Sequence, residues 1–366
     1  MERGRQGRLP WAIVLIIVVF CCAAAYAGAM IWTRAQNGST FTSYSVYRPE
    51  AVQKLEVVNN GFVYYDGSSL TKVSDGGNIQ WNYIVGVNAD FKATRAGVAS
   101  WVGNSLTLIS AGNGTPTYSG NMDSEILSAT LGSEYAAVLL GPEHNSTIVL
   151  MEAGGNRVDS ITLSDQTVID YGFFFNDTLF WVMTLDTNGT APSCTVSTYR
   201  PGRRLVGSIS DNEQTFYHAS FQQTQISCTG DTFLKYYTYN GTEDTSLRTL
   251  VYGWTLVDED DYSDNPMMAF TLNGEYDASS NIRDIRLLRG TNSQVLRMPY
   301  DCMNVLVSGD RVFGFSPDGY IMAGRMGQQK VDAYQTILSF DRVYGITGNN
   351  IAVLANSSEV YLVNMK

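Results

Sequence analysis

The densest group of side chains able to do chemistry is an acidic run, which reads Asp258-Glu259-Asp260-Asp261-Tyr262-Ser263-Asp264-Asn265. Carboxylate oxygens are the ligands that Ca²⁺ prefers. The run therefore predicts a calcium site with Asp258, Asp260, Asp261 and Asp264 as candidate ligands. Its spacing differs from the calcium loop of helix–loop–helix proteins, because Tyr262 stands at the third ligand position. A solvated loop between two repeats is the alternative.

Histidine motifs of common metal sites are missing from the sequence. The two histidines, His144 and His218, stand far apart, and neither H-E-x-x-H nor C-x-x-C occurs. A zinc site of common spacing is therefore not expected. His144 stands in a turn-forming segment and His218 in a strand-like one, so we expect both to be structural or exposed. The motifs predict no catalytic residue and no cofactor.

Three cysteines lie outside the apolar N-terminal segment that holds Cys21 and Cys22. They are Cys194, Cys228 and Cys302, and an odd number in an exported domain leaves at least one unpaired. Cys194 and Cys228 fall in neighbouring repeats and form the disulfide candidate. The alternative is that they are buried thiols in the core.

Carboxylates offer one further chemistry. Two of them facing each other can cleave a glycosidic bond, one as the acid and the other as base or nucleophile. Residues 35–366 hold 34 acidic side chains, too many for the sequence to single out a pair.

The elements that must position these residues are short β-strands. Residues 55–83 read LEVVNNGFVYYDGSSLTKVSDGGNIQWNY. Asn-Asn-Gly and Asp-Gly-Ser turns separate three strands over 55–58, 62–65 and 69–73, and an Asp-Gly-Gly turn leads into Ile79-Gln80-Trp81. This succession of strands and turns, ending in a Trp, predicts one blade of a β-propeller, which has four strands.

Degenerate copies of this unit fill the chain at a period of about 40 residues, which is typical of propeller blades. The last copy has room for only three strands, and residues 41–48 form a strand without a blade. We therefore predict that the N-terminal strand completes the last blade of an all-β, eight-bladed propeller. Seven blades, with the weak sixth copy as an insertion, and a pair of β-sandwiches are the alternatives. The copies after the first cover 93–119, 127–163, 168–209, 224 onwards, 267–298, 304–338 and 342–365.

A membrane anchor is predicted before the propeller. Residues 9–33 are 25 residues without a charge, and as a helix they would span about 37 Å at ~1.5 Å per residue. Arginines within residues 1–8 predict a cytoplasmic tail. The prediction is a single-pass membrane protein, with a tether over 34–40 and residues 41–366 outside the cytoplasm. A signal peptide cleaved after Ala27 is the alternative.

The net charge excludes one class of partner. The chain carries −11, and residues 35–366 alone carry 20 basic and 34 acidic side chains, a net charge of −14. Nucleic-acid binding needs clustered Lys and Arg against phosphates, so no nucleic-acid partner is expected.

Residues 61–81 resemble the quinoprotein-type, or PQQ-like, propeller repeat, at Gly61, Asp66-Gly67, Leu70, Gly76-Gly77 and Trp81. Residues 316–320 match the middle of that repeat again. The resemblance implies the fold and not an activity. Quinoprotein dehydrogenases place a vicinal disulfide over the quinone, whereas the vicinal pair here lies in the predicted membrane span. The whole layout resembles an uncharacterised family of membrane-anchored propellers of Gram-positive bacteria.

The sequence thus favours a tethered, extracytoplasmic binding or scaffolding module for a protein, glycan or cell-envelope partner. A carbohydrate-active hydrolase or lyase, with carboxylates in the central channel, is the alternative. A sensor is a third hypothesis, although a tail of eight residues is too short for a signalling domain.

Overall fold

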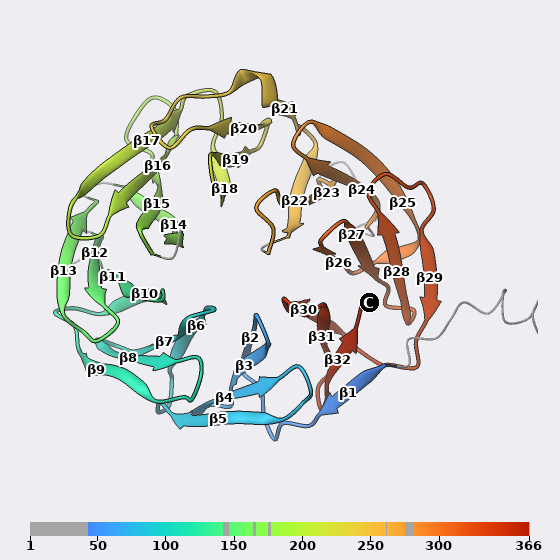
Figure 1. Cartoon of the computed structure of the whole chain (residues 1–366), viewed down its shortest axis with the longest axis horizontal. Coiled ribbons are helices and arrows are strands. Elements are labelled where there is room, and N and C mark those ends of the chain that lie inside the picture. The colour runs from blue at the N-terminus through green and yellow to red at the C-terminus, as the bar shows by residue number, and fades with distance from the viewer. Residues whose placement is uncertain are drawn as a thin grey trace, which may run out of the picture.

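A computed structural model describes residues 43–141, 146–163, 166–174, 177–260, 262–274 and 282–365. Within them, eight four-stranded antiparallel sheets stand side by side in a ring, each as one blade (Figure 1). The prediction of an all-β, eight-bladed β-propeller is confirmed. The seven-bladed and β-sandwich alternatives are wrong.

The first strand of each of blades 1 to 7 lies innermost, and in blade 8 the innermost strand is β30 (Figure 1). Blades 1 to 4 comprise β2 (Lys54–Val58), β3 (Gly61–Tyr65), β4 (Ser69–Ser74), β5 (Ile79–Ile84); β6 (Asp90–Ala93), β7 (Gly97–Val102), β8 (Ser105–Ser110), β9 (Pro116–Asn121); β10 (Ile126–Leu131), β11 (Tyr135–Leu140), β12 (Thr147–Glu152), β13 (Arg157–Thr162); β14 (Thr167–Phe174), β15 (Leu179–Asp186), β16 (Ser193–Arg200) and β17 (Arg204–Asp211). Blades 5 to 8 comprise β18 (Phe216–Phe221), β19 (Ile226–Gly230), β20 (Phe233–Tyr237), β21 (Thr249–Leu250) with the short 3₁₀ helix η2 (Thr245–Leu247) before it; β22 (Trp254–Glu259), β23 (Met268–Leu272), β24 (Ile282–Arg289), β25 (Asn292–Cys302); β26 (Asn304–Ser308), β27 (Arg311–Phe315), β28 (Tyr320–Arg325), β29 (Asp332–Gln335); β30 (Arg342–Ile346), β31 (Ile351–Ala355), β32 (Val360–Asn364) and β1 (Tyr44–Tyr47).

The N-terminal strand closes the ring as predicted. β1 pairs antiparallel with β32, from Tyr44 opposite Val363 to Tyr47 opposite Val360. The last blade therefore combines one strand from the start of the chain with three from its end. The predicted membrane helix over 9–33 lies outside the described residues and stays a prediction. Within the described part of the chain, no helix has the length and apolarity needed to cross a bilayer.

Three inner strands differ from the sequence expectation. The fifth and sixth repeats begin at β18 and β22, whereas the sequence predicted their start at residues 224 and 267. In blade 2, β6 ends where the predicted repeat begins, at residue 93. The bulges of β18 and β22 do not by themselves account for this, because β10 and β14 also have a bulge and lie in predicted repeats.

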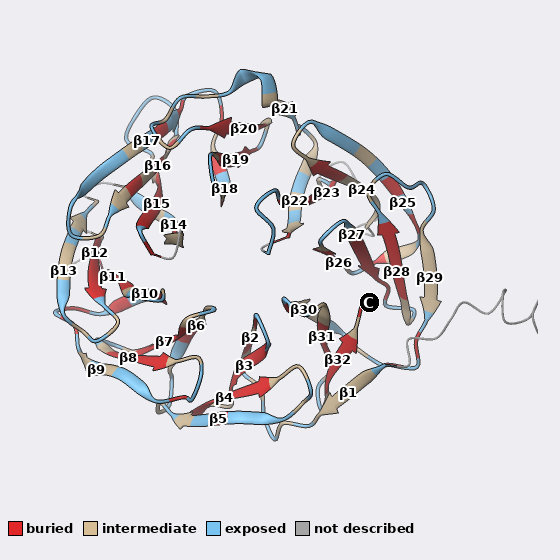
Figure 2. Ribbon diagram, in the orientation of Figure 1, coloured by how far each residue is buried: buried red, intermediate tan, exposed pale blue. Residues whose placement is uncertain are grey.

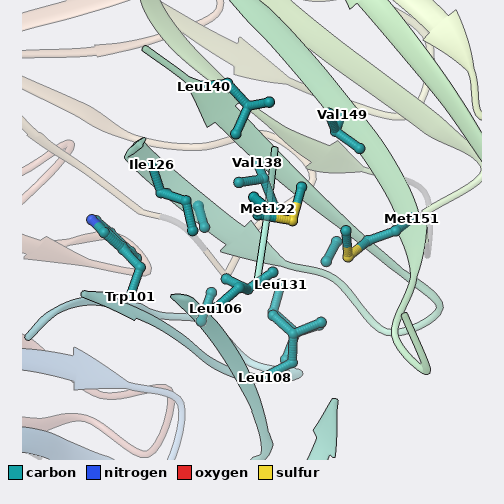
Figure 3. Packing of buried hydrophobic residues seen from close by; sticks show 13 residues of the cluster. Trp101, Leu106, Leu108, Met122, Ile126, Leu131, Val138, Leu140, Val149 and Met151 are labelled. Atoms are coloured by element: carbon teal, nitrogen blue, oxygen red, sulfur yellow. The ribbon is translucent and has the colours of Figure 1, made fainter. Parts of the chain in front are cut away.

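Burial is concentrated in the second and third strands of each blade, and the outermost strands are largely exposed (Figure 2). In blade 1, every residue of β3 is buried, but β5 buries only Trp81. The core therefore lies in the seams between neighbouring blades. Figure 3 shows the seam of blades 2 and 3, where Leu106 and Leu108 of β8 pack against Leu131 of β10 and Val138 of β11.

Candidate functional site

Asp258 and Glu259 of the acidic run end β22, and the rest of the run lies in the loop between β22 and β23, over residues 260–267. The loop lies within blade 6 and not between two repeats, and it turns toward the interior of the ring beside β22 (Figure 1). It buries Asp260, while residues 262–265 are exposed, as the alternative of a solvated loop expected. The ring of Tyr262 lies under the guanidinium of Arg95 in blade 2, at 4.6 Å from its centroid. A Cβ added to Gly348 in blade 8 would lie 3.0 Å from the same ring. The loop thus reaches across the channel from blade 6 to blades 2 and 8.

Two pockets lie on either side of this loop, at the end of the channel where the inner strands finish. The smaller, of about 350 Å³, is lined by the inner strands of blades 1, 6, 7 and 8. The larger, of about 680 Å³, is lined by blades 2 to 6. Glu259 and Tyr262 line both pockets. We call this loop-divided end of the channel the divided mouth.

The divided mouth is acidic. Lys92 and Arg95 are its basic lining residues among the described part of the chain, and each has a partner: Lys92 lies 3.7 Å from Asp170, and Arg95 stacks on Tyr262. A concave surface with one dominant sign of charge focuses the electrostatic field on a ligand. The acidic lining residues are Glu56, Asp170, Asp177, Asp258, Glu259, Asp260 and Asp264.

The calcium candidates bind different protein groups. Asp258 Oδ2 accepts the Val307 N–H at 2.6 Å, and Asp264 Oδ2 accepts an N–H of the Gln223 side chain at 3.0 Å. Asp260 Oδ1 accepts the Tyr262 N–H. Among the described residues, no three His, Cys, Asp or Glu side chains gather as a metal site would require. Asp261 lies outside the described residues, so the calcium site stays a prediction.

His218 of blade 5 contacts Glu259 of blade 6, close to the loop between β22 and β23. Its Nε2 lies 3.0 Å from Glu259 Oε1. The cross-strand pairing of His218 with Thr229 places them on one face of blade 5, and Ser227 shares this face because it lies two residues from Thr229. The hydroxyls of Ser227 and Thr229 are fully buried, and no group in the described ranges hydrogen-bonds to them. The contact between blades 5 and 6 therefore contains buried polar groups that have no hydrogen-bond partner among the described residues. His144 lies outside the described residues.

All three cysteines of the propeller carry free, buried thiols in the structure. Cys194 and Cys228 share the hydrophobic cluster between blades 4 and 5, where the Cys194 thiol donates to the Phe216 carbonyl. Burial raises the pKa of Cys194 and Cys228, and raises that of Cys302 to about 12. The disulfide between Cys194 and Cys228 stays a prediction.

The pKa shifts lend no support to a two-carboxylate hydrolase. Such chemistry needs one carboxyl group with a raised pKa to act as the acid. The described carboxyl groups with a shifted pKa are all shifted downward, and none lines the divided mouth: Asp66, Asp211, Glu213 and Glu359.

The fold and this mouth define a class: an eight-bladed β-propeller with one loop laid across the channel. A scan of protein-family models finds no match, and a search of curated proteins finds no related sequence. Solved structures do match. BamB from Moraxella catarrhalis is 11% identical, with a TM-score of 0.56 over 89% of this chain and 98% of its own.

Two further structures show how widely the fold is shared. The WD40 domain of SCAP from fission yeast is 10% identical, with a TM-score of 0.61 over 88% of this chain and 98% of that one. The computationally designed Ika8 protein is 13% identical, with a TM-score of 0.55 over 89% and 100%. At these identities the likeness shows the fold alone.

Sequence reasoning found the acidic run but not its partners. Arg95 stands in a blade-2 turn, more than 160 positions before Tyr262. No local pattern links the two, because their contact depends on how the ring closes.

Proposed function

We propose that the protein is a non-enzymatic binding module whose ligand occupies the divided mouth. The observation that carries this proposal is the loop between β22 and β23, which spans the channel and forms a wall of two pockets. Ligand sites are typically concave and have volumes of about 300 to 1,000 Å³, and both pockets fall in this range.

The proposal includes a tether on the outside of a membrane. Its support is the apolar segment 9–33 behind a basic tail. β1, which follows the proposed tether, is the outermost strand of blade 8 (Figure 1). A chain entering at the outer rim leaves the divided mouth accessible to a ligand.

A photo-crosslinking amino acid at Tyr262 of the full-length chain, expressed in its native cells, tests the binding site. The matched control places the same amino acid at Tyr252, which is 62% exposed, stands in the turn between β21 and β22 and lines neither pocket. We expect a discrete crosslinked species from position 262 and none from 252. Identical patterns from both positions, or no crosslink at 262, would overturn the proposal.

A Val87→Cys variant tests the topology, because Val87 is exposed and the native thiols of the propeller are buried. A membrane-impermeant maleimide should label this variant on intact cells as strongly as on lysed cells. Labelling only after lysis would contradict an extracytoplasmic propeller.

A further inference from the structure

Four consecutive blades carry a β-bulge on the innermost strand, and in each the extra residue is aliphatic or aromatic; the hydroxyl of the one tyrosine accepts the Leu256 N–H of blade 6. The extra residues are Leu127 in β10, Ile169 in β14, Tyr217 in β18 and Val257 in β22, where the pairing with the second strand skips one residue. Their exposed fractions are 49%, 42%, 39% and 40%. A bulged residue is left out of the ladder and turned away from its neighbours. We call these four residues the apolar belt.

The apolar belt faces the channel. Neighbouring blades cover both faces of an inner strand, and the second strand of the blade covers its outer edge. The channel is then the main open direction for a side chain within such a strand. The inner strands of blades 1, 2 and 7 pair continuously and have no bulge. The inner strand of blade 8 has a bulge at Tyr344, which is less exposed than the four belt residues. The belt therefore occupies the part of the channel wall that blades 3 to 6 form.

The four belt residues lie outside the lining of the two pockets, but two of them stand next to acidic lining residues on the same inner strand. Ile169 directly precedes Asp170, and Val257 stands two residues before Glu259. Glu259 Oε2 is buried, and no donor in the described part of the chain reaches it. A buried carboxylate oxygen without a donor is costly. The fully buried Ser227 and Thr229 hydroxyls, on the blade-5 face that meets Glu259, are unsatisfied in the same way.

The backbone of the channel wall offers a third kind of contact. Every inner strand is the terminal strand of its sheet. Its free edge turns backbone groups toward the channel that no further strand pairs with, and such edges can bind extended polypeptide. Part of this edge is already bound by side chains of neighbouring blades: Ala93 N–H donates to Glu56, Leu256 N–H to Tyr217 and Val307 N–H to Asp258. A lipid amine or a polyamine supplies a cation but has no backbone to match this edge.

We propose that the divided mouth, together with the channel wall that carries the apolar belt, binds an extended peptide segment of a partner protein, in which Lys or Arg alternates with apolar residues. The basic side chain donates to Glu259, and the apolar side chains pack on the apolar belt. This inference rests on the proposed function and names the chemistry of its ligand. The net charge of −14 over residues 35–366 favours such a ligand and repels an acidic one.

Fluorescence anisotropy of the full-length chain in zwitterionic nanodiscs tests the proposal, with empty nanodiscs subtracted. The probe is a labelled ten-residue peptide of alternating Lys and Leu. The comparison peptides alternate Glu with Leu, and Lys with Ser. We expect the Lys–Leu peptide to bind at least tenfold more tightly than either, with an affinity that falls as salt rises.

Two variants assign the contacts. Glu259→Gln and Val257→Asn should each weaken the Lys–Leu peptide tenfold or more. The matched control is Leu205→Asn on β17, an exposed apolar residue of an outer strand, which should not change binding. An unchanged melting temperature shows that each variant is folded.

Equal binding of the three peptides, or binding that neither channel variant alters, would overturn the inference. These results separate it from the proposed function. A crosslink at position 262 without Lys–Leu binding leaves the binding module standing and removes the basic apolar peptide as its ligand. The absence of a crosslink at position 262 would overturn the proposed function, the binding module itself.

Discussion

Carboxylate side chains in this protein fasten neighbouring blades to one another. Glu56 of blade 1 accepts the Ala93 N–H of blade 2 at 2.6 Å, and Asp258 of blade 6 accepts the Val307 N–H of blade 7 at the same distance. Hydrogen bonds to an ionised acceptor are stronger than neutral ones. Part of the large acidic content is therefore structural, and single acidic residues cannot be read from the sequence as ligands or catalysts.

A buried ion pair between blades 4 and 5 is the most consequential of these contacts. Lys235 Nζ lies 2.7 Å from Asp211 and 2.6 Å from Glu213. Burial alone would raise the pKa of Asp211, but the hydrogen bond from Lys235 and further donors lower it overall. Burial likewise would lower the pKa of Lys235, and its two carboxylate partners raise it.

Lys235→Met should lower the free energy of unfolding by about 3 kcal/mol at pH 7, because Asp211 is left as a buried charge without its cation. Since the folded pKa of Asp211 lies below its usual 3.8, the pair stabilises the protein above that pH and loses this effect as the pH falls through the folded pKa. Denaturant unfolding at pH 7 and pH 3 checks this. The deficit of the variant should shrink at pH 3.

Lys330→Met is the matched control, because Lys330 forms an exposed pair with Asp332. Its cost should be much smaller than that of Lys235→Met at either pH, because water and salt screen an exposed pair. A cost for Lys235→Met no larger than that of this control would contradict the buried pair.

The buried thiols should be inert in the folded protein. Burial raises the pKa of Cys302 to about 12 and shifts Cys194 and Cys228 in the same direction, so little reactive thiolate forms at pH 8. Peptide mapping after iodoacetamide should find all three alkylated only when the protein was first unfolded. A linked peptide containing Cys194 and Cys228 would instead establish the disulfide.

At the scale of single elements, one glycine allows two neighbouring strands of blade 1 to approach each other closely. Gly61 begins β3 with φ of +145°, and a Cβ built there would lie 1.9 Å from the Val73 carbonyl oxygen of β4. The first two hairpins can approach this closely only because residue 61 has no side chain. The turn that marked the repeat in the sequence is thus also a packing requirement.

Gly61→Ala should cost about 3 kcal/mol, because the backbone of β4 must move to admit the methyl group. Gly103→Ala is the control: it also has positive φ, but no atom lies within 4 Å of its added Cβ, so about 1 kcal/mol is expected. Thermal unfolding of both variants measures the difference. Equal losses would show that conformation alone, and not the contact with β4, restricts this site.

At the scale of the whole molecule, stability depends on closing the ring. Each blade buries its apolar faces only against its two neighbours, and blade 8 is complete only when β1 joins β32. Tyr44 and Val46 pack on the cluster shared by blades 7 and 8. The same closure brings blades 2, 6 and 8 close enough for one loop to contact all three.

Val46→Asp should open this closure, because it places a charge in the apolar cluster beside β32. We expect a melting temperature lower by several degrees and faster hydrogen exchange confined first to β32 and β1. Ser43→Asp, at an exposed position just before β1, should leave both unchanged. Exchange that rises evenly over all blades would contradict a local opening.

Much of the architecture could be predicted because its signals are local. Turn residues such as those at 59–61 recur at a regular period, and counting strands at the two ends of the chain predicted the shared last blade. The fifth and sixth repeats were predicted to start too late, past β18 and β22, although the segment that holds His218 was expected to be strand-like. In β22 the acidic residues that follow the bulge were also assigned to a loop.

The sequence by itself determined the propeller, its eight blades, its strand closure and its acidic character, since each of these follows from backbone turn chemistry, strand periodicity or composition. Only the tertiary structure decided that residues 260–267 cross the channel, that Arg95 meets Tyr262, and that four bulged apolar residues share one wall. These contacts join residues far apart in the chain. They depend on the angle at which each blade packs on the next, which the whole ring sets and no local segment encodes.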